Sequence, residues 1–353
     1  MRSAVAVALS GAIGLAAARP QLERRAVDKY PAGTTWDIVL DKSSVNLNNL
    51  ASTEAAKVAV IDIDMFDNDA ATISKLKKDG KKVICYFSAG SRENWRGDAS
   101  RFTSNDYGKV MDGWEEENWV NVKSQNVKNI MADRIKLAAS KGCDAVDPDN
   151  TDGFVSTPST IRFQPLDQSG SPPQNPPDEN EPPQDGYNWG EQAYVDYFKF
   201  LAGEAKKNNM AIGLKNSISM IPQVVNLIQF AVNEQCHEYN ECEDYLPLTQ
   251  ADKAVFAINY GPKDCTSPGG TKLSILTKPS HQNLNVTGGA CKPSWKTASA
   301  SLTSVDEEPA VEEATPAPET GDEEEEEEEY DDEENEDENE DEEEGPWWSH
   351  RHD

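Results

Sequence analysis

Short apolar runs alternate with longer amphipathic stretches through the middle of the chain. The short runs are rich in Val, Ile and Phe and are too short for helices, so they predict strands. These runs are Trp36–Leu40, Val58–Ile63, Lys82–Phe87, Asp144–Val146, Ala211–Leu214, Phe230–Val232, Ala254–Ile258 and Leu273–Leu276. Helical spacing of apolar residues predicts helices over Ala70–Asp79, Asn126–Ser140, Gly190–Asn208 and Ser217–Leu227.

Repeated strand–helix alternation favours parallel strands with helical crossovers. Eight strands in about 250 residues fit the α/β class and a closed (β/α)8 barrel of the TIM type. An open, doubly wound sheet is the alternative. No Gly-x-Gly-x-x-Gly pattern follows any predicted strand, so no dinucleotide site, and no other cofactor, is predicted.

The first 25 residues are typical of an exported precursor. Arg2 precedes an apolar run, Ala4–Ala17, which is too short to span a membrane. We therefore predict a signal peptide over residues 1–18, no membrane span, and a secreted, extracellular monomer. Residues 19–25 form a possible propeptide ending at the dibasic Arg24-Arg25, and the barrel domain covers residues 26–296.

The C-terminal end is strongly acidic. Residues 301–353 contain 27 Asp or Glu and one Arg, so most of the net charge of −31 lies there. We expect residues 297–353 to be a disordered tail, which serves either as a polyanionic tether for a cationic polymer or as a solubilising spacer. Residues 164–187 are rich in Pro, Gln and Asp and predict a surface insertion in the barrel domain. No cluster of Lys and Arg offers a nucleic-acid surface.

Six cysteines, an even number, suggest disulfides in an exported chain. Cys236 and Cys242, and Cys265 and Cys291, are the expected local pairs. The remaining two, Cys85 and Cys143, either pair across neighbouring strands or stay as buried thiols. No Cys-x-x-Cys motif occurs and the chain has four His, so no metal site is predicted. Asn285-Val286-Thr287 is a glycosylation acceptor.

Polar side chains gather at the expected carboxyl ends of the strands, where barrel active sites lie. They include Asp62, Asp64, Tyr86, Asp147, Asp149, Asn150, Asp152, Lys215, Asn216 and Glu234. The alternative for 147–152 is an Asx turn that caps the next segment. Because five polar strand ends converge on one rim, an active site is favoured over this turn.

Two carboxylates on opposite sides of a sugar are what glycosidic cleavage requires, so the site is expected to be that of a glycoside hydrolase. Five Trp are candidate sugar platforms or core residues: Trp36, Trp95, Trp114, Trp119 and Trp189.

Several motifs resemble glycoside hydrolase family 114. They are Cys85-Tyr86-Phe87-Ser88-Ala89-Gly90-Ser91 with Glu93, Trp95, Arg96 and Asp98, Lys141-Gly142-Cys143-Asp144, Pro148-Asp149-Asn150-Thr151-Asp152-Gly153, Gly213-Leu214-Lys215-Asn216, and Asn233-Glu234-Gln235-Cys236 with Tyr239 and Cys242. The resemblance covers about residues 35–278 and implies a (β/α)8 endo-α-1,4-polygalactosaminidase with a retaining mechanism.

The resemblance implies that Asp149 is the nucleophile and Glu234 the general acid/base. It also implies that the cleaved sugar is held by Asp64, Tyr86, Asp147, Asn150, Lys215 and Asn216. One pair departs from the family pattern: Asn259-Tyr260 stands where a Glu-Tyr pair is expected. This departure puts the contacts on that side in doubt, and Tyr260 remains a predicted substrate contact.

Such a substrate is a cationic amino-sugar polysaccharide. The carboxylates of Asp62, Asp64, Asp147 and Asp152 suit its ammonium groups. Close carboxylates are also expected to keep the proton donor protonated, which predicts an activity optimum below pH 7. The rival hypotheses are a catalytically silent carbohydrate-binding or matrix protein and a hydrolase of a related α-galactosyl linkage.

Overall fold

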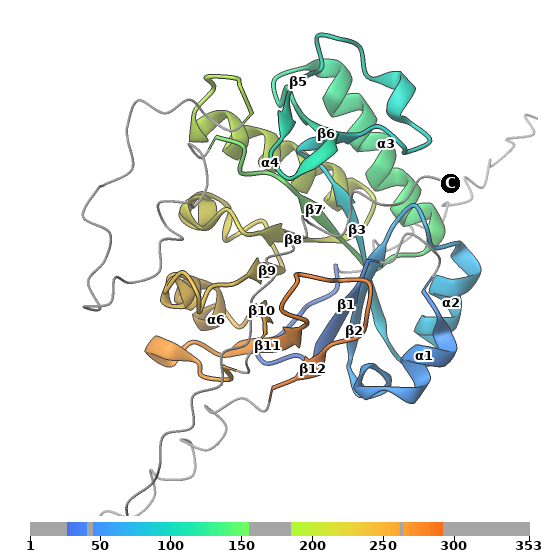
Figure 1. Ribbon diagram of the computed structural model, residues 1–353, viewed down its shortest axis with the longest axis vertical. Coiled ribbons are helices and arrows are strands. Elements are labelled where there is room, and N and C mark those ends of the chain that lie inside the picture. The colour runs from blue at the N-terminus through green and yellow to red at the C-terminus, as the bar shows by residue number, and fades with distance from the viewer. Residues whose placement is uncertain (1–26, 41–44, 155–184, 262–263, 292–353) are drawn as a thin grey trace, which may run out of the picture.

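A parallel barrel forms the centre of the molecule (Figure 1). The computed structural model describes residues 27–40, 45–154, 185–261 and 264–291. Eight strands pair in parallel in the order β1-β2-β3-β7-β8-β9-β10-β11, and β12 adds antiparallel to β11. Their bounds are β1 Trp36–Val39, β2 Val60–Asp64, β3 Lys82–Ser88, β7 Ala145–Asp149, β8 Ala211–Lys215, β9 Phe230–Glu234, β10 Ala254–Tyr260, β11 Leu273–Lys278 and β12 Gly289–Ala290. All eight predicted apolar runs are strands, and the predicted barrel class is confirmed.

Side chains join β1 and β11, the first and last of the eight parallel strands. The indole nitrogen of Trp36 donates to the carbonyl oxygen of Ser274 at 2.8 Å. The ammonium group of Lys278 lies 2.9 Å from a carboxylate oxygen of Asp37, and both side chains are almost fully buried. These contacts close the sheet into a barrel and rule out the open, doubly wound alternative.

Replacing Lys278 with Met should destabilise the fold by about 3 kcal/mol, because it leaves the buried carboxylate of Asp37 without its counter-charge. The unfolding midpoint in urea gives the measurement, with the exposed Lys75→Met as the matched control. An unchanged midpoint for Lys278→Met would show that the ion pair does not stabilise the closed barrel.

The helices outside the barrel differ widely in length, from 17 residues in α3 to four in α5. Their bounds are α1 Leu47–Ser52, α2 Ala70–Lys78, α3 Gln125–Lys141, α4 Glu191–Lys207, α5 Ile221–Val224 and α6 Leu246–Gln250. In α3, the side chain of Ser124 caps the first turn, and Gly142 ends the helix at φ 94°, which favours glycine. The helix predicted over 217–227 is wrong in extent. Ser217 has φ 47°, and only a 3₁₀ turn and the four residues of α5 are helical there.

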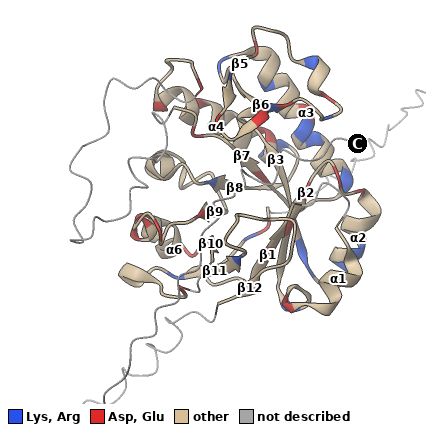
Figure 2. Cartoon of the chain, viewed as in Figure 1, with Lys and Arg blue, Asp and Glu red and all other residues tan. Residues whose placement is uncertain are grey.

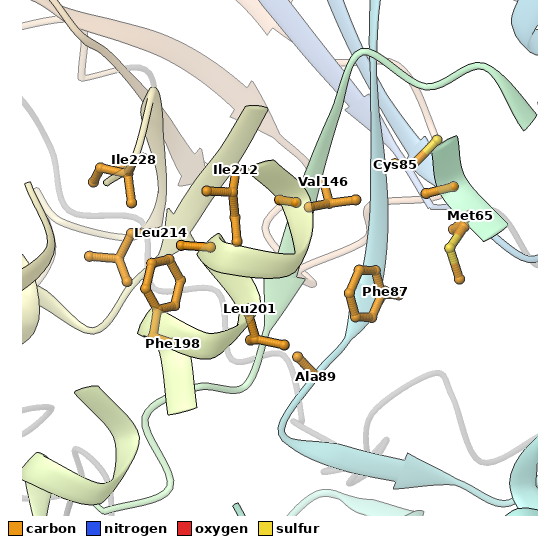
Figure 3. Packing of buried hydrophobic residues seen from close by; sticks show 14 of the residues in the cluster. Met65, Cys85, Phe87, Ala89, Val146, Phe198, Leu201, Ile212, Leu214 and Ile228 are labelled. Carbon is orange, nitrogen blue, oxygen red and sulfur yellow. The ribbon is translucent and has the colours of Figure 1, made fainter. Parts of the chain in front are cut away.

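Buried apolar side chains form two layers. Inside the barrel, residues such as Trp36, Phe230 and Phe256 pack together, and the rings of Trp36 and Phe256 stack at 4.8 Å. Outside it, Phe198 and Leu201 of α4 lie against the strand residues of β8 (Figure 3). Since strand side chains alternate between faces, every second residue of each strand points into the barrel.

A small antiparallel sheet, with the strand order β4-β6-β5, is formed by the segment of the chain between β3 and α3. It consists of β4 Ser91–Glu93, β5 Tyr107–Met111 and β6 Trp114–Val120. The apolar pattern did not predict this sheet, since β5 exposes most of its residues and β6 contains three consecutive Glu. Figure 2 shows acidic residues on β6 and basic residues along α2 and α3. Asp112-Gly113 in the connecting turn, with Gly113 at φ 79°, is a hairpin signal in the sequence.

All six cysteines form disulfides: Cys85–Cys143, Cys236–Cys242 and Cys265–Cys291. Both expected local pairs are confirmed, and the first pair resolves the question left open for Cys85 and Cys143. The sulfurs of Cys236 and Cys242 lie near the ring of His237, but their disulfide leaves no thiolate to hold a metal.

Within the described ranges, no helix combines the length and the apolar character needed to cross a bilayer. The signal peptide, the propeptide, the acidic tail and residues 164–184 of the insertion lie outside the described residues. Those assignments stay predictions.

Candidate active site

Alternation along the strands explains how the polar rim is assembled. Ile84, Ala145, Ala211 and Phe230 belong to the interior layer of the barrel. Residues an even number of positions later on the same strands face the same way. By this parity the inward-facing positions at the carboxyl ends are Asp62, Asp64, Tyr86, Asp147, Asp149, Lys215, Glu234 and Tyr260. The apolar interior therefore forms a floor beneath a cluster of ionisable groups.

Lys215 bridges the two carboxylates selected from the sequence. Its ammonium nitrogen lies 3.1 Å from Oδ1 of Asp149 and 2.6 Å from Oε2 of Glu234. The nearest oxygens of the two carboxylates therefore lie no more than about 6 Å apart, close to the sugar-sized gap of about 5 Å. Burial alone would lower the pKa of Lys215, but Asp149, Glu234 and Asp147 raise it well above its usual range. Lys215 is thus a fixed positive charge between the carboxylates.

Each of the two carboxylates also accepts a hydrogen bond from a tyrosine. The hydroxyl of Tyr86 donates to Oδ2 of Asp149 at 2.9 Å, and the hydroxyl of Tyr260 donates to Oε1 of Glu234. Burial and the nearby carboxylates raise the pKa of both phenols, so they remain proton donors at ordinary pH. The two tyrosines orient the carboxylates.

The ionisation of Glu234 differs from the expectation that close carboxylates would keep it protonated. Burial favours the neutral acid, but the charge and hydrogen bond of Lys215, followed by hydrogen bonds from Tyr260 and Asn216, lower the pKa of Glu234 below its usual value. That expectation is wrong because the ammonium group of Lys215 lies between the carboxylates and stabilises the charged form of Glu234.

Asn150 and Asn216 hold the backbone around the two carboxylates. Asn150 has φ 62°, and its own N–H donates to Oδ1 of Asp149 at 2.8 Å. Asn216 has φ 46°, and its side-chain oxygen accepts from the backbone N–H of Glu234 at 3.0 Å. Left-handed backbone is costly for residues other than glycine and often marks functional sites.

The end of β3 packs directly on the Asp149 loop. The backbone N–H groups of Ala89 and Gly90 both donate to the carbonyl oxygen of Asp149, at 2.9 and 3.0 Å. A Cβ added to Gly90 would lie only 1.5 Å from the carbonyl oxygen of Asn150. Only glycine allows this close approach of the two backbones.

Asp62 of β2 and Asp147 of β7, two strands separated by β3, form a buried pair of inward-facing acids. Both side chains are 0% exposed, and no donor among the described residues bonds to their oxygens. Each carboxyl group lies within hydrogen-bonding reach of the other, so the pair can share a proton. Burial raises the pKa of both, that of Asp147 to about 7 despite the opposing charge of Lys215.

The carboxylate of Asp64 binds an arginine of the protein that the sequence did not identify as its partner. Its carboxylate accepts hydrogen bonds from both terminal nitrogens of Arg96, at 2.6 and 3.2 Å, and from the backbone N–H groups of Phe66 and Asp67. Arg96 also pairs with Glu93. The carboxylate of Asp64 therefore binds Arg96 within the fold, and its contact with the substrate ammonium stays a prediction.

Asp152 lies beside the cluster and is half-buried. Burial, followed by the charge of Asp149, raises its pKa to about 6.

Of the five Trp, Trp36 and Trp119 are core residues, whereas Trp95, Trp114 and Trp189 are 37%, 39% and 36% exposed. Only the last three remain candidates for sugar platforms. The sequence patterns did not identify Glu117, a buried carboxylate on β6.

Comparisons with known proteins agree with this geometry. A model of glycoside-hydrolase family GH114 matches residues 17–296. The crystal structure of Aspergillus fumigatus Ega3 in complex with galactosamine is similar, with a TM-score of 0.62 and 36% identity over 75% of this chain and 98% of that chain. The glycoside hydrolase domain of PelA from Pseudomonas aeruginosa has a TM-score of 0.50 and 10% identity over 73% and 98% of the two chains, which shows the fold alone. Among curated proteins, no match is found.

Proposed function

Because the chain belongs to glycoside hydrolase family GH114, we propose that it cleaves α-1,4-linked galactosamine polymers within the chain and retains the anomeric configuration. Asp149 is the nucleophile and Glu234 the general acid/base in this proposal. The observation that supports it most directly is the contact of one ammonium group, that of Lys215, with both carboxylates. This contact keeps the nearest oxygens of the two carboxylates within about 6 Å of each other, close to the roughly 5–5.5 Å of retaining enzymes and below the roughly 6.5–9.5 Å of inverting ones.

The proposed reaction has two steps. Asp149 attacks the anomeric carbon while Glu234 protonates the departing glycosidic oxygen, which leaves a glycosyl ester on Asp149. Glu234, now a carboxylate, then removes a proton from water as the water attacks the same carbon and releases Asp149. The hydrogen bonds from Tyr86 and Tyr260 hold the two carboxylates in position for these steps.

Acidic groups at the mouth of the site support an amino sugar as the substrate. The carboxylates of Asp149 and Glu234 are partly exposed and can accept hydrogen bonds from an ammonium group of the sugar, whereas Asp62 and Asp147 are fully buried. Asp152 adds a further acidic group at the rim. The similarity to a structure that contains galactosamine agrees with this assignment. Three disulfides support secretion to an oxidising compartment.

The direct test incubates the protein with partially deacetylated α-1,4-polygalactosamine and identifies released oligomers by mass spectrometry. We expect oligomers of several lengths early in the reaction, and NMR should show newly formed ends in the α configuration first. Tight binding without release would favour a silent carbohydrate-binding protein instead. Release only from a galactosyl polymer without amino groups would change the substrate assignment.

The activity should be highest below pH 7. Glu234 must carry a proton to act as the acid, and its lowered pKa in the empty enzyme means that this proton is lost early as the pH rises. Replacing Lys215 with Met removes the main cause of the lowering, so the alkaline limb of kcat/KM should move to higher pH even though the rate falls. The exposed Lys136→Met is the control. An optimum above pH 8, or an identical profile for Lys215→Met, would contradict the role of Glu234 as the acid.

A further inference from the structure

The small sheet β4-β6-β5 places a further carboxylate near the proposed nucleophile. Glu117 of β6 is buried and contributes to raising the pKa of Tyr86, the tyrosine that bonds to Asp149. The proposed mechanism gives Glu117 no role. A buried acid close to an active site requires a physical explanation.

A chain of hydrogen bonds leads from Glu117 to the loop that follows Asp149. The hydroxyl of Ser91 donates to Oε2 of Glu117 at 2.5 Å, and the hydroxyl oxygens of Ser88 and Ser91 lie 2.5 Å apart. The side-chain amide of Asn150 donates to the Ser88 oxygen at 2.8 Å.

The direction of this chain follows from counting donors. The Ser88 oxygen already accepts from Asn150 and from the backbone N–H of Ser91, at 2.8 and 3.2 Å. Its own proton therefore goes to the Ser91 oxygen, and the Ser91 proton goes to Glu117. Glu117 is the terminal acceptor, and without it the hydroxyl groups of both serines lose their common direction.

The other end of the chain bears on the nucleophile. Asn150 holds a left-handed backbone, and this conformation directs its N–H to Oδ1 of Asp149 at 2.8 Å. The side chain of Asn150 is anchored by Ser88 alone among the hydrogen bonds of the described residues. Releasing this anchor would allow the strained backbone to relax and the N–H to leave the carboxylate.

We infer that Glu117 is a positioning residue for Asp149, which it holds in place through Ser91, Ser88 and Asn150. The expected effect of Glu117 on catalysis rests on the proposed function, whereas its expected effect on the position of Asn150 and Asp149 does not.

Glu117 is surrounded by charges from each element around it. Glu93 of β4, Arg96 in the loop after β4 and Asp149 of β7 all act on it. Burial, followed by the charge of Glu93, raises the pKa of Glu117 to about 8. Below that pH it is a neutral acid whose carbonyl oxygen still accepts from Ser91. Glutamine keeps this acceptor and this neutral charge, so it should replace Glu117 in mildly acidic solution.

The kinetic test compares variants of the two ends of the chain. Glu117→Leu and Ser91→Ala should each lower kcat about tenfold while KM stays within about twofold. The double variant should lose little more than either single variant, because both remove the same connection. Glu117→Gln should recover to within about threefold of the wild type at pH 5. The exposed Glu115→Leu is the control, and thermal unfolding confirms that each variant is folded.

Three results would overturn the inference in an active enzyme: an unchanged kcat for Glu117→Leu, losses that multiply in the double variant, or a change confined to KM, which would indicate direct contact with substrate. A crystal structure of Ser91→Ala provides a readout independent of catalysis. We expect the Asn150 amide to leave Ser88 and its N–H to move away from Asp149. If Asn150 did not move, the inference would be rejected, whether or not the wild type is active on polygalactosamine. If the wild type were inactive on polygalactosamine, only the proposed function would be rejected.

Discussion

Asp149→Asn should lower kcat/KM by at least about 10⁴-fold, the loss typical of removing a nucleophile. The amide has nearly the shape of the carboxylate. Its oxygen can still accept from Lys215 and its NH2 group can donate to the hydroxyl oxygen of Tyr86, so the site should stay assembled. It cannot form a glycosyl ester, because its oxygen carries no negative charge to attack the anomeric carbon. Released oligomers, quantified by mass spectrometry, give the rate.

Two controls separate chemistry from folding. The exposed Asp79→Asn should match the wild type, and Asp149→Asn should unfold at a temperature close to that of the wild type. It should also still bind the polymer. A loss smaller than about tenfold would mean that another group is the nucleophile.

Glu234→Gln should lower kcat on the polymer by about 10²–10⁴-fold, the usual contribution of a general acid or base. The loss has two sources, since Glu234 protonates the departing oxygen in the first step and activates water in the second. An aryl galactosaminide has a leaving group that needs no proton. With that substrate the first step should survive, and the glycosyl-enzyme should accumulate.

Mass spectrometry of the quenched protein detects this intermediate. We expect one added sugar on the peptide that contains Asp149. Glu238→Gln, at an exposed position, should accumulate none. If Glu234→Gln hydrolysed the aryl substrate at the wild-type rate with no added sugar, Glu234 would not be the acid/base residue. If Glu234→Gln hydrolysed the aryl substrate slowly and still carried no added sugar, the result would indicate an inverting mechanism.

The barrel could be predicted because its strands are buried on both faces. Such strands consist of continuous apolar runs, and the polar residues that follow them stand out in the sequence. The sheet β4-β6-β5 could not be predicted in the same way, because β5 and β6 are half-exposed and rich in charge. Its clearest signal was the Asp112-Gly113 turn.

The members of the site were largely predictable, but their electrostatics were not. The pKa of Glu234 depends on an ammonium group from a neighbouring strand, 19 residues earlier in the chain. Asp64 carries the same inward parity as Asp62, yet its carboxylate binds Arg96, which lies in a loop 32 residues away. Such pairings arise only when the loops are placed in space, and neither strand periodicity nor composition encodes them.

The ion pair that closes the barrel lies next to the proposed reaction site. The groups proposed to carry out the reaction stand on β3, β7, β8, β9 and β10, which are consecutive in the sheet, and the ion pair of Lys278 and Asp37 fastens the junction of β11 with β1. Lys278 is also the strand partner of Tyr260, whose hydroxyl donates to Glu234. Breathing at that junction therefore begins one strand away from the proposed acid/base residue, and a weakened junction should lower turnover as well as shorten the lifetime of the protein at high temperature.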